Sequence, residues 1–385
     1  MSSPSIIQTL DKITVEKQTL FNVLMELTYR CNHDCVMCYN APEKGRQELS
    51  LTEVKSCLDQ LQELGCFTLI FSGGEILMRK DFFEIGRYAH TLGFAITLFT
   101  NGSLITEKNV HRILEISPLD VGITLLGSTA ELHDRLAKSP GSFSRIIHAI
   151  ELLKELQVRV YLKGPQMKSN LFDYESLLAL GKRLNVPCEV SPLITTKTDG
   201  DKFPLQYRIS QEDLLNFYRD KKIYPEGNEP SLLPPDMERD SQLCEAGITG
   251  AAINPYGDVM PCIQMPIVAG NIRQQALADI WRNAPIFNKL RGISDEDLHE
   301  CRICPYKDYC SRCPGMAYLE NGDLLGPAKL FCQHAQAKYQ VTQERKTGKT
   351  VMANEFSLSP EKTYLRQEMN LSHSCSSCEH CACSH

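Results

Sequence analysis

The sequence predicts an α/β protein: an open, partial barrel of six β-then-α units, followed by a small loop-rich domain. Three observations indicate this fold. Short apolar runs alternate with amphipathic segments between about residues 20 and 195. Residues 195–240 are polar and rich in proline, as expected of a bridge. From about residue 241 helical periodicity weakens and closely spaced cysteines take over, so we expect metal to hold that part together.

The alternation gives the elements in chain order. The apolar runs predict strands at residues 21–28, 67–72, 94–100, 119–126, 158–164 and 187–193. Helical spacing, in several cases after a Ser, Thr or Asp that favours an N-cap, predicts helices at 50–65, 81–93, 107–117, 144–157 and 174–185. Such alternation forms a parallel sheet, and six units are too few to close an eight-stranded barrel. Functional residues are therefore expected at the carboxyl ends of the strands.

The same patterns divide the chain into five parts. We expect an N-terminal extension over 1–20, the barrel over 21–200, the bridge over 201–240, the cysteine-rich domain over 241–340 and a flexible tail rich in Cys and His over 341–385.

Composition excludes several classes of protein. The chain has 385 residues, of which 42% are apolar and 23% charged, so it is not a largely disordered chain. Its net charge of −6 gives no reason to expect a nucleic-acid partner. There is no signal-peptide pattern and no apolar stretch of the ~18 residues that a membrane helix needs. We therefore expect a cytoplasmic protein, in which 17 cysteines indicate metal or redox chemistry rather than disulfides.

The first cysteine group follows the first predicted strand. Cys31, Cys35 and Cys38 form a Cys-x3-Cys-x2-Cys loop. Three thiolates on a tight loop suit an iron–sulfur cubane with one iron left open for a chelating small molecule. A structural zinc site is the alternative, but zinc sites of that kind want four ligands and no fourth is near.

Further motifs follow the later strands in order. Gly73-Gly74-Glu75 ends the second strand, Asn101 lies in Thr-Asn-Gly after the third, Ser128 follows the fourth and Asn170 the fifth. Together with the cysteine loop, this order resembles the radical S-adenosylmethionine (SAM) superfamily. The resemblance implies that Gly73, Gly74 and Glu75 engage the methionine amino group of SAM, and that the three later polar residues lie at the SAM site.

The chain departs from that family pattern at several places. Met37 stands before the third cysteine, where relatives usually have an aromatic residue, and Tyr39 follows that cysteine. We expect Met37 and Tyr39 beside the adenine, since Met packs well on aromatic faces. Ile76 replaces the frequent proline after Gly-Gly-Glu, and Thr-Leu-Leu-Gly replaces Ser-Leu-Asp-Gly after the fourth strand. Neither of the last two changes removes a cluster ligand.

The second cysteine group resembles a SPASM domain, an extension that carries auxiliary iron–sulfur clusters. Its seven cysteines surround an Asn-Pro-Tyr-Gly-Asp hairpin signal and a Gly-Asn-Ile…Ile-Trp segment. A zinc-ribbon-like element is the alternative. The resemblance implies two auxiliary clusters, one held by four thiolates and one by three with an open or non-cysteine position. The first set is Cys301, Cys304, Cys310 and Cys332, and the second is Cys244, Cys262 and Cys313.

The resemblance also implies the chemistry. Members of the family reduce bound SAM to a 5′-deoxyadenosyl radical, which takes a hydrogen atom from a substrate. The leading hypothesis is a maturase that forms a thioether or carbon–carbon crosslink in a ribosomally made precursor peptide. Its expected partners are a peptide or protein substrate, a reductant such as flavodoxin or ferredoxin, and a separate leader-binding protein or another surface. We expect no membrane partner. No catalytic acid or base is identified.

Other functions stay open. A sulfatase-maturing enzyme is disfavoured, since Ile263 stands where those relatives have an acidic residue. A haem-pathway radical SAM enzyme shares much of the cysteine layout. A non-catalytic iron–sulfur carrier or scaffold would have no use for the Gly-Gly-Glu site. The tail is an adventitious metal-binding segment or a source of a further cluster ligand, through Cys375, Cys378, Cys381 and Cys383.

Overall fold

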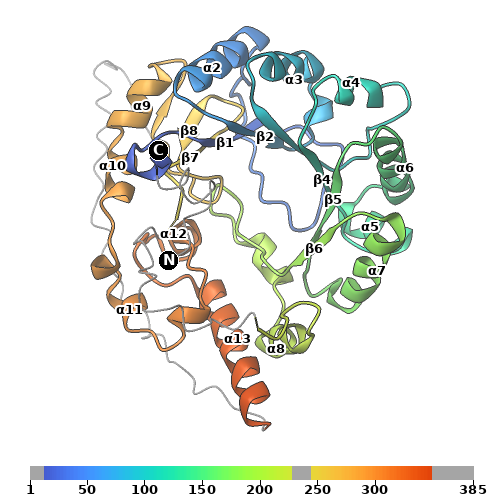
Figure 1. The fold of residues 1–385 in the computed structure, drawn as a ribbon, viewed down its shortest axis with the longest axis vertical. Helices are drawn as coiled ribbons and strands as arrows, with labels where there is room; N and C mark the ends of the chain where they lie inside the picture. The colour runs from blue at the N-terminus through green and yellow to red at the C-terminus, as the bar shows by residue number, and fades with distance from the viewer. Residues whose placement is uncertain (1–12, 228–243, 349–385) are drawn as a thin grey trace, which may run out of the picture.

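The computed structural model describes residues 13–227 and 244–348. Most of the expected N-terminal extension, the Pro-rich end of the bridge and the four tail cysteines lie outside these ranges. The described residues form an α/β structure with one nine-stranded sheet, ordered β6-β5-β4-β3-β2-β1-β7-β8-β9. Figure 1 shows the first six strands curving around an open centre with helices on their outer side.

The six predicted strands all exist, and their mutual pairing is parallel. They are β1 (Asn22–Thr28), β2 (Thr68–Gly73), β3 (Ala95–Thr100), β4 (Asp120–Thr124), β5 (Val160–Pro165) and β6 (Cys188–Ser191). Each lies within about two residues of its predicted range, with β6 the shortest. The predicted open barrel of six βα units is therefore confirmed.

The five predicted helices also exist. They are α2 (Leu51–Glu63), α3 (Phe82–Thr91), α4 (Val110–Leu114), α6 (Ser142–Glu155) and α7 (Tyr174–Leu184). Local chemistry explains the sharp start of α2: Ser50 accepts from the backbone N–H of Glu53, and the Glu53 carboxylate accepts from the Ser50 N–H. This reciprocal capping box satisfies two backbone donors that a helix end otherwise leaves open.

The C-terminal domain extends the barrel sheet, and beyond its hairpin signal the sequence did not predict this. Its strand β7 (Gly250–Ile253) pairs in parallel with the outer edge of β1, and β8 (Asp258–Met260) and β9 (Gly270–Asn271) continue the sheet antiparallel. All four residues of β7 are buried. The short run GAAI shows no alternation of apolar and polar residues that would predict a strand. It forms a strand by pairing with the free edge of β1.

Short helices complete this domain. They are α9 (Leu277–Asn283), α10 (Pro285–Arg291), α11 (His299–Arg302) and α12 (Pro314–Asn321). In the part of the chain that the structure describes, no helix has the length and apolar character needed to cross a membrane.

Three further helices were not predicted: α5 (Ala130–Ala137), α8 (Gln211–Arg219) and α13 (Lys329–Thr347). Helix α8 lies inside the expected bridge and packs on α13, burying Leu214 and Phe217 against Ala337 and Val341. Helix α13 continues past residue 341, where the flexible tail was expected to begin. Its buried side chains include small and polar ones such as Ala335, His334 and Thr342, so it lacks the apolar stripe that predicts a helix.

Candidate active site

The first cysteine loop lies directly beyond the carboxyl end of β1. Backbone bonds from Asp34 N–H to the Ala137 carbonyl and from Val36 N–H to the Leu136 carbonyl tie it to the end of α5. A turn from Cys38 N–H to the Cys35 carbonyl closes the loop. The loop is therefore held in place by α5 as well as by β1.

The three thiols of this loop are electrostatic neighbours. Burial, followed by Cys38 and Cys31, raises the pKa of Cys35 to about 12. Burial likewise raises the pKa values of Cys31 and Cys38. Such thiols stay protonated at neutral pH unless a metal replaces the proton. Three soft ligands on one loop fit a cubane iron–sulfur cluster, whose fourth iron is left for another molecule.

Gly73 and Gly74 are required by the backbone that faces them. A Cβ on Gly73 would lie 2.3 Å from the Thr28 carbonyl oxygen, and one on Gly74 would lie 2.4 Å from that of Arg30. Gly73 has φ +129°, which side chains rarely allow. Hydrogen bonds from Gly74 N–H to Thr28 and from Glu75 N–H to Arg30 fasten this turn to the start of the cysteine loop.

Glu75 is fully buried and links two strand ends. Its carboxylate accepts from the Leu77 N–H, the Thr100 hydroxyl and the Asn101 N–H, at 2.7–3.1 Å. Burial raises its pKa despite these bonds. The sequence predicted a direct ion pair with an ammonium group of SAM. In the structure its bonds hold the Thr-Asn-Gly turn, and its contact with SAM stays a prediction.

Asn101 reaches the first cysteine loop, and its predicted contact with SAM stays a prediction. Its side-chain amide donates to Asn32 at 2.9 Å and lies 3.9 Å from the Cys31 sulfur.

Ser128 and Asn170 lie at the same edge but are bonded within the protein. Ser128 donates from both its N–H and its hydroxyl to Asp173. Buried Asn170 donates to the carbonyls of Leu126 and Pro165 and accepts from the Met167 N–H. Both side chains therefore order the ends of β4 and β5, and contact with SAM stays a prediction for each.

Met37 and Tyr39 point into different surroundings. Met37 packs with Leu126, Met167 and Ile194 beside the ends of β4 and β5. The Tyr39 hydroxyl instead donates to Glu26 on β1. Contact of either side chain with adenine stays a prediction.

Two residues near the loop were missed by sequence reasoning. Burial raises the pKa of Glu26 to about 7, and the carboxylate accepts from the hydroxyls of Tyr29 and Tyr39. Asn40 donates to the Gly73 carbonyl, and its own Oδ1 is buried with no hydrogen-bond partner among the described residues. Glu26 could have been found from the sequence, because it is a charged residue inside the apolar run of a strand. No sequence pattern marks Asn40.

An unpaired acceptor beside Gly73 fits a cationic ligand. The Gly73 carbonyl and the Asn40 Oδ1 stand together at the carboxyl end of β2. An ammonium group carries three donors, and a buried acceptor without a partner is costly. The residues present therefore suit the amino group of SAM.

The cysteines of the C-terminal domain fall into two groups. Cys244, Cys262 and Cys313 interact electrostatically with one another, as do Cys301, Cys304, Cys310 and Cys332. Burial raises the pKa of Cys262 to about 11 and that of Cys332 to about 12. Within the described ranges no three His, Cys, Asp or Glu side chains are arranged to hold a single metal ion. That each group holds a cluster stays a prediction.

A polar joint connects the cysteine loop with the hairpin between β7 and β8. Arg46 makes a forked bond to Asp258 at 2.7 and 2.9 Å and stacks on Tyr256, 4.6 Å from its ring centre. Burial opposes the charge of Asp258, but bonds from Arg46, Asn271 and Asn254 hold its pKa below the usual value. The Tyr256 ring also packs edge-on against Tyr29. The SAM site and the C-terminal domain are thus directly joined.

Comparison with known proteins agrees with this geometry. Residues 25–167 match the family model of the radical SAM superfamily, and residues 244–314 match SPASM, an iron–sulfur cluster-binding domain. The AdoMet-dependent heme synthase of Methanosarcina barkeri is 32% identical over 328 residues, which cover 79% of this chain and 93% of that protein. The chain belongs to the radical SAM superfamily. It is a radical SAM enzyme with a SPASM domain, so iron–sulfur clusters and SAM are its cofactors.

Other radical SAM proteins resemble it more distantly. The AdoMet-dependent heme synthase of Oleidesulfovibrio alaskensis is 28% identical over 344 residues, 82% of this chain and 88% of that protein. Streptococcus suis SuiB bound to its precursor peptide SuiA has a TM-score of 0.64 at 17% identity, covering 86% and 82% of the two chains. The anSMEcpe protein with bound AdoMet and the Kp18Cys peptide has a TM-score of 0.63 at 18% identity, covering 84% and 97%. These two structures share the fold of this radical SAM enzyme.

Proposed function

We propose that this radical SAM enzyme modifies a peptide or protein, forming a thioether or carbon–carbon crosslink in a ribosomally made precursor. When bound, the cluster and SAM supply a 5′-deoxyadenosyl radical that takes a hydrogen atom from the substrate. Cys31, Cys35 and Cys38 would hold that cluster. The Gly73 carbonyl and Asn40 would bind the amino group of SAM, and Glu75 would fix the neighbouring turn.

The observation that carries the substrate class is the mixed polar and aromatic face that β3 and β5 form. Buried residues alternate with half-buried ones along β3 and β5, and the latter face the open centre. Lys163 on β5 lies over the Phe99 ring on β3, 3.5 Å from its centre. Gly122 on the intervening strand leaves room for this contact, since a Cβ there would lie 3.1 Å from Phe99.

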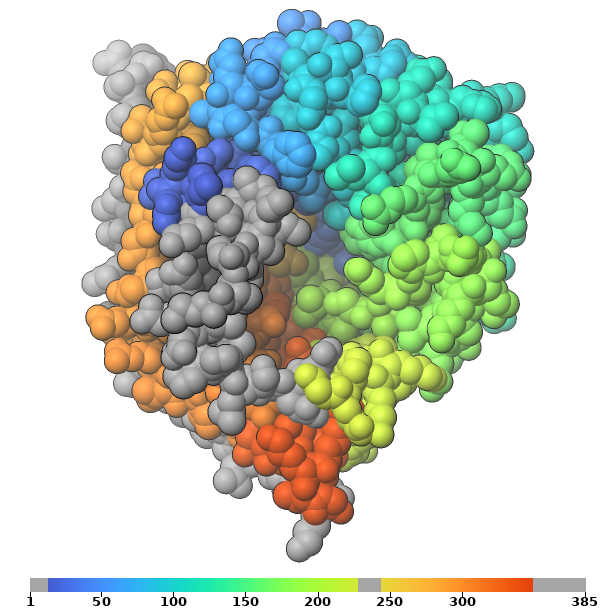
Figure 2. Space-filling model, viewed as in Figure 1, coloured from blue at the N-terminus to red at the C-terminus, as the bar shows by residue number. Residues whose placement is uncertain are grey.

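Opposite charges continue this wall toward β6. Lys163 pairs in register with Glu189, and the two interact electrostatically. Burial lowers the pKa of Lys163 to about 8, which leaves it mostly charged at neutral pH. Thr124 pairs with Lys163 on its other side. Figure 2 shows the molecule hollowed between this side of the barrel and the C-terminal domain. A surface that offers both hydrogen-bond donors and acceptors suits the amide groups of a peptide. A flat apolar macrocycle would instead need an apolar surface.

The C-terminal cysteines suit the electron count of such a reaction. A crosslink removes two hydrogens from the substrate, one as an atom and one as a proton with an electron left over. We assign two auxiliary clusters to the two thiol groups, with four cysteines on one and three on the other. They would accept this electron and pass it to flavodoxin or ferredoxin. A leader-binding partner, if one is used, belongs to the same proposal.

A second substrate class is a haem precursor. It is favoured by the likeness to AdoMet-dependent heme synthases, which extends over 93% of the Methanosarcina barkeri protein. An iron porphyrin carries acidic side chains, and Lys163 could pair with one of them.

Turnover of matched substrates separates the two classes. The anaerobically reconstituted chain is incubated with SAM and dithionite, together with peptides encoded by short reading frames beside its gene or with an iron porphyrin. We expect one peptide to stimulate 5′-deoxyadenosine formation and to lose the mass of two hydrogens. Cys35→Ala serves as the control without the SAM cluster. Stimulation by the porphyrin alone would move the assignment to haem formation.

A further inference from the structure

Arg312 is the charged side chain that contacts both thiol groups of the C-terminal domain. It stands between Cys310 and Cys313 in sequence, and these belong to different groups. Arg312 is a hydrogen-bond and electrostatic partner of Cys301 and an electrostatic partner of Cys310, both in the four-thiol group. Its interaction with Cys244 of the three-thiol group is electrostatic only.

The backbone fixes one end of this guanidinium and leaves another part free. A terminal nitrogen of Arg312 donates to the carbonyls of Leu324 and Gly326, the latter at 3.0 Å. Its Nε is buried and has no hydrogen-bond partner among the described residues. A buried donor without a partner is costly, so a sulfur or sulfide beside it would be stabilising.

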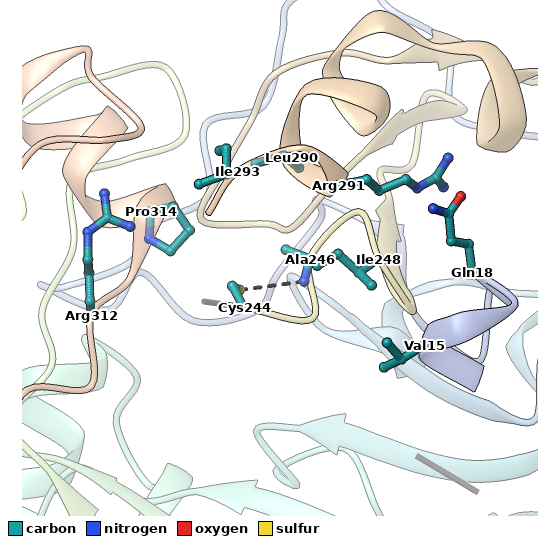
Figure 3. A pocket seen from close by; sticks show the side chains of 10 residues that line it. All are labelled: Val15, Gln18, Cys244, Ala246, Ile248, Leu290, Arg291, Ile293, Arg312 and Pro314. Carbon is teal, nitrogen blue, oxygen red and sulfur yellow. Dashed lines mark hydrogen bonds between the residues drawn. The ribbon is translucent and has the colours of Figure 1, made fainter. Parts of the chain in front are cut away.

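A small cavity brings Arg312 and Cys244 together. Its volume is about 160 Å³, and its lining includes Cys244, Arg312, Arg291 and Pro314. Figure 3 shows Arg312 and Pro314 at the left of this cavity and Cys244 nearer its middle. Other charges near the sulfurs each touch one group: Glu245 lies near Cys244, and Lys338 lies near Cys310.

We propose that Arg312 is a shared positioning residue that raises the reduction potentials of both auxiliary clusters. This rests on the two auxiliary clusters of the proposed function. Reduction adds a negative charge to a cluster, and a fixed cation close to its sulfurs favours the reduced form. One guanidinium that serves both clusters keeps their potentials close together, which suits transfer of an electron between them.

The test measures midpoint potentials rather than activity. The full chain carries Cys31→Ala, Cys35→Ala and Cys38→Ala, so that only auxiliary clusters give a signal in a redox titration followed by electron paramagnetic resonance. About eight iron atoms per chain are expected for two cubanes. About four iron atoms per chain would mean a single auxiliary cluster, which would overturn the shared role of Arg312. That result would leave the substrate assignment untouched.

In this background Arg312→Gln removes the charge. We expect both midpoints to fall, with about a tenfold lower ratio of reduced to oxidised cluster at a fixed potential, or about 59 mV for a one-electron couple. Arg302→Gln is the matched control, since Arg302 follows Cys301 but is exposed to solvent. Unchanged midpoints in Arg312→Gln would reduce Arg312 to a structural role, and a shift of only one cluster would refute the shared role.

Arg312→Lys covers the case in which the glutamine variant fails to retain iron. A lysine keeps the charge but cannot bond the Gly326 carbonyl and reach Cys301 at once. We expect a shift of both midpoints in the same direction as for glutamine, but smaller. A rise of either midpoint above that of the parent chain would overturn the proposal.

Discussion

The barrel and the distal part of the C-terminal domain are stabilised in different ways. The barrel shares one apolar core with the proximal part of that domain, including Ile253, Trp281 and Phe287. Beyond residue 298 short helices precede α13, which packs on α8, and Met316, Ala317, Ala328 and Leu330 form a separate small apolar cluster. A small cluster of that size contributes little burial. We infer that the barrel folds by burying apolar surface, whereas the distal segment depends on its thiols and the metal they bind.

The largest expected effect comes from removing one thiol from each region. Cys35→Ala should lower 5′-deoxyadenosine formation by more than the roughly 100-fold that loss of an outer-shell partner costs, because a ligand of the SAM cluster is gone. The barrel should keep its circular dichroism. Cys304→Ala should do the reverse: SAM cleavage without substrate persists, but the distal segment becomes sensitive to proteases. Equal protease resistance in the two variants would contradict the contrast between the regions.

The Gly-Gly-Glu turn tests how tightly the barrel is built at the SAM edge. Gly73→Ala places a Cβ against the Thr28 carbonyl in a backbone conformation that glycine favours. We expect a loss of about 3 kcal/mol in the free energy of unfolding, measured in urea, and weaker SAM binding. Gly93→Ala is the control, because Gly93 also has positive φ, +85°, but has open space around it. Gly93→Ala should lower the free energy of unfolding by about 1 kcal/mol. Similar losses for Gly73→Ala and Gly93→Ala would show that the Gly-Gly-Glu turn can relax.

Replacing Lys163 should raise the stability of the chain and lower its activity. Lys163→Met removes a buried charge, so it should raise the free energy of unfolding at pH 7 by an amount on the order of 2 kcal/mol while reducing substrate turnover. The pKa of Lys163 in the folded chain, about 8, lies below the ordinary lysine value of 10.5. The unfolded chain therefore binds more protons between these values, and the stability of the parent chain should rise with pH across that window.

The control for this change is Lys55→Met, which removes a lysine from a surface ion pair with Glu84. It should leave turnover and the pH dependence as they are. A Lys163→Met chain with an unaltered stability profile between pH 8 and 10.5 would show that Lys163 is not desolvated.

The joint between the two regions should give the smallest effect. Arg46→Gln removes the forked bond to Asp258, whose side chain is only 7% exposed but keeps bonds from Asn254 and Asn271. We expect a loss of about 1 kcal/mol in the free energy of unfolding, and faster hydrogen exchange in the hairpin between β7 and β8. Arg87→Gln breaks an exposed pair with Glu115 and should cost less than about 0.5 kcal/mol. Equal costs would mean that the joint behaves like an ordinary surface pair.

Much of the site was predictable because its residues follow strand ends. In a parallel sheet these ends meet at one edge, so the order of Cys31, Gly73, Asn101 and Ser128 along the chain was enough to place them together. The family motifs supplied their chemistry. The partners of each side chain were not predictable. Asn40, whose buried Oδ1 has no hydrogen-bond partner among the described residues, gave no signal in the sequence, because a lone amide after a cysteine has many uses.

The sequence by itself determined the barrel and its six strands and indicated two groups of cysteines, because periodicity and spacing are local properties of a chain. Only the tertiary structure decided that β7 extends the barrel sheet, that α8 and α13 pack together, that Glu75 holds a turn and that Arg312 touches both thiol groups. These are contacts between residues far apart in sequence. Their energies come from burial and charge at short range, which exist only once the chain has folded.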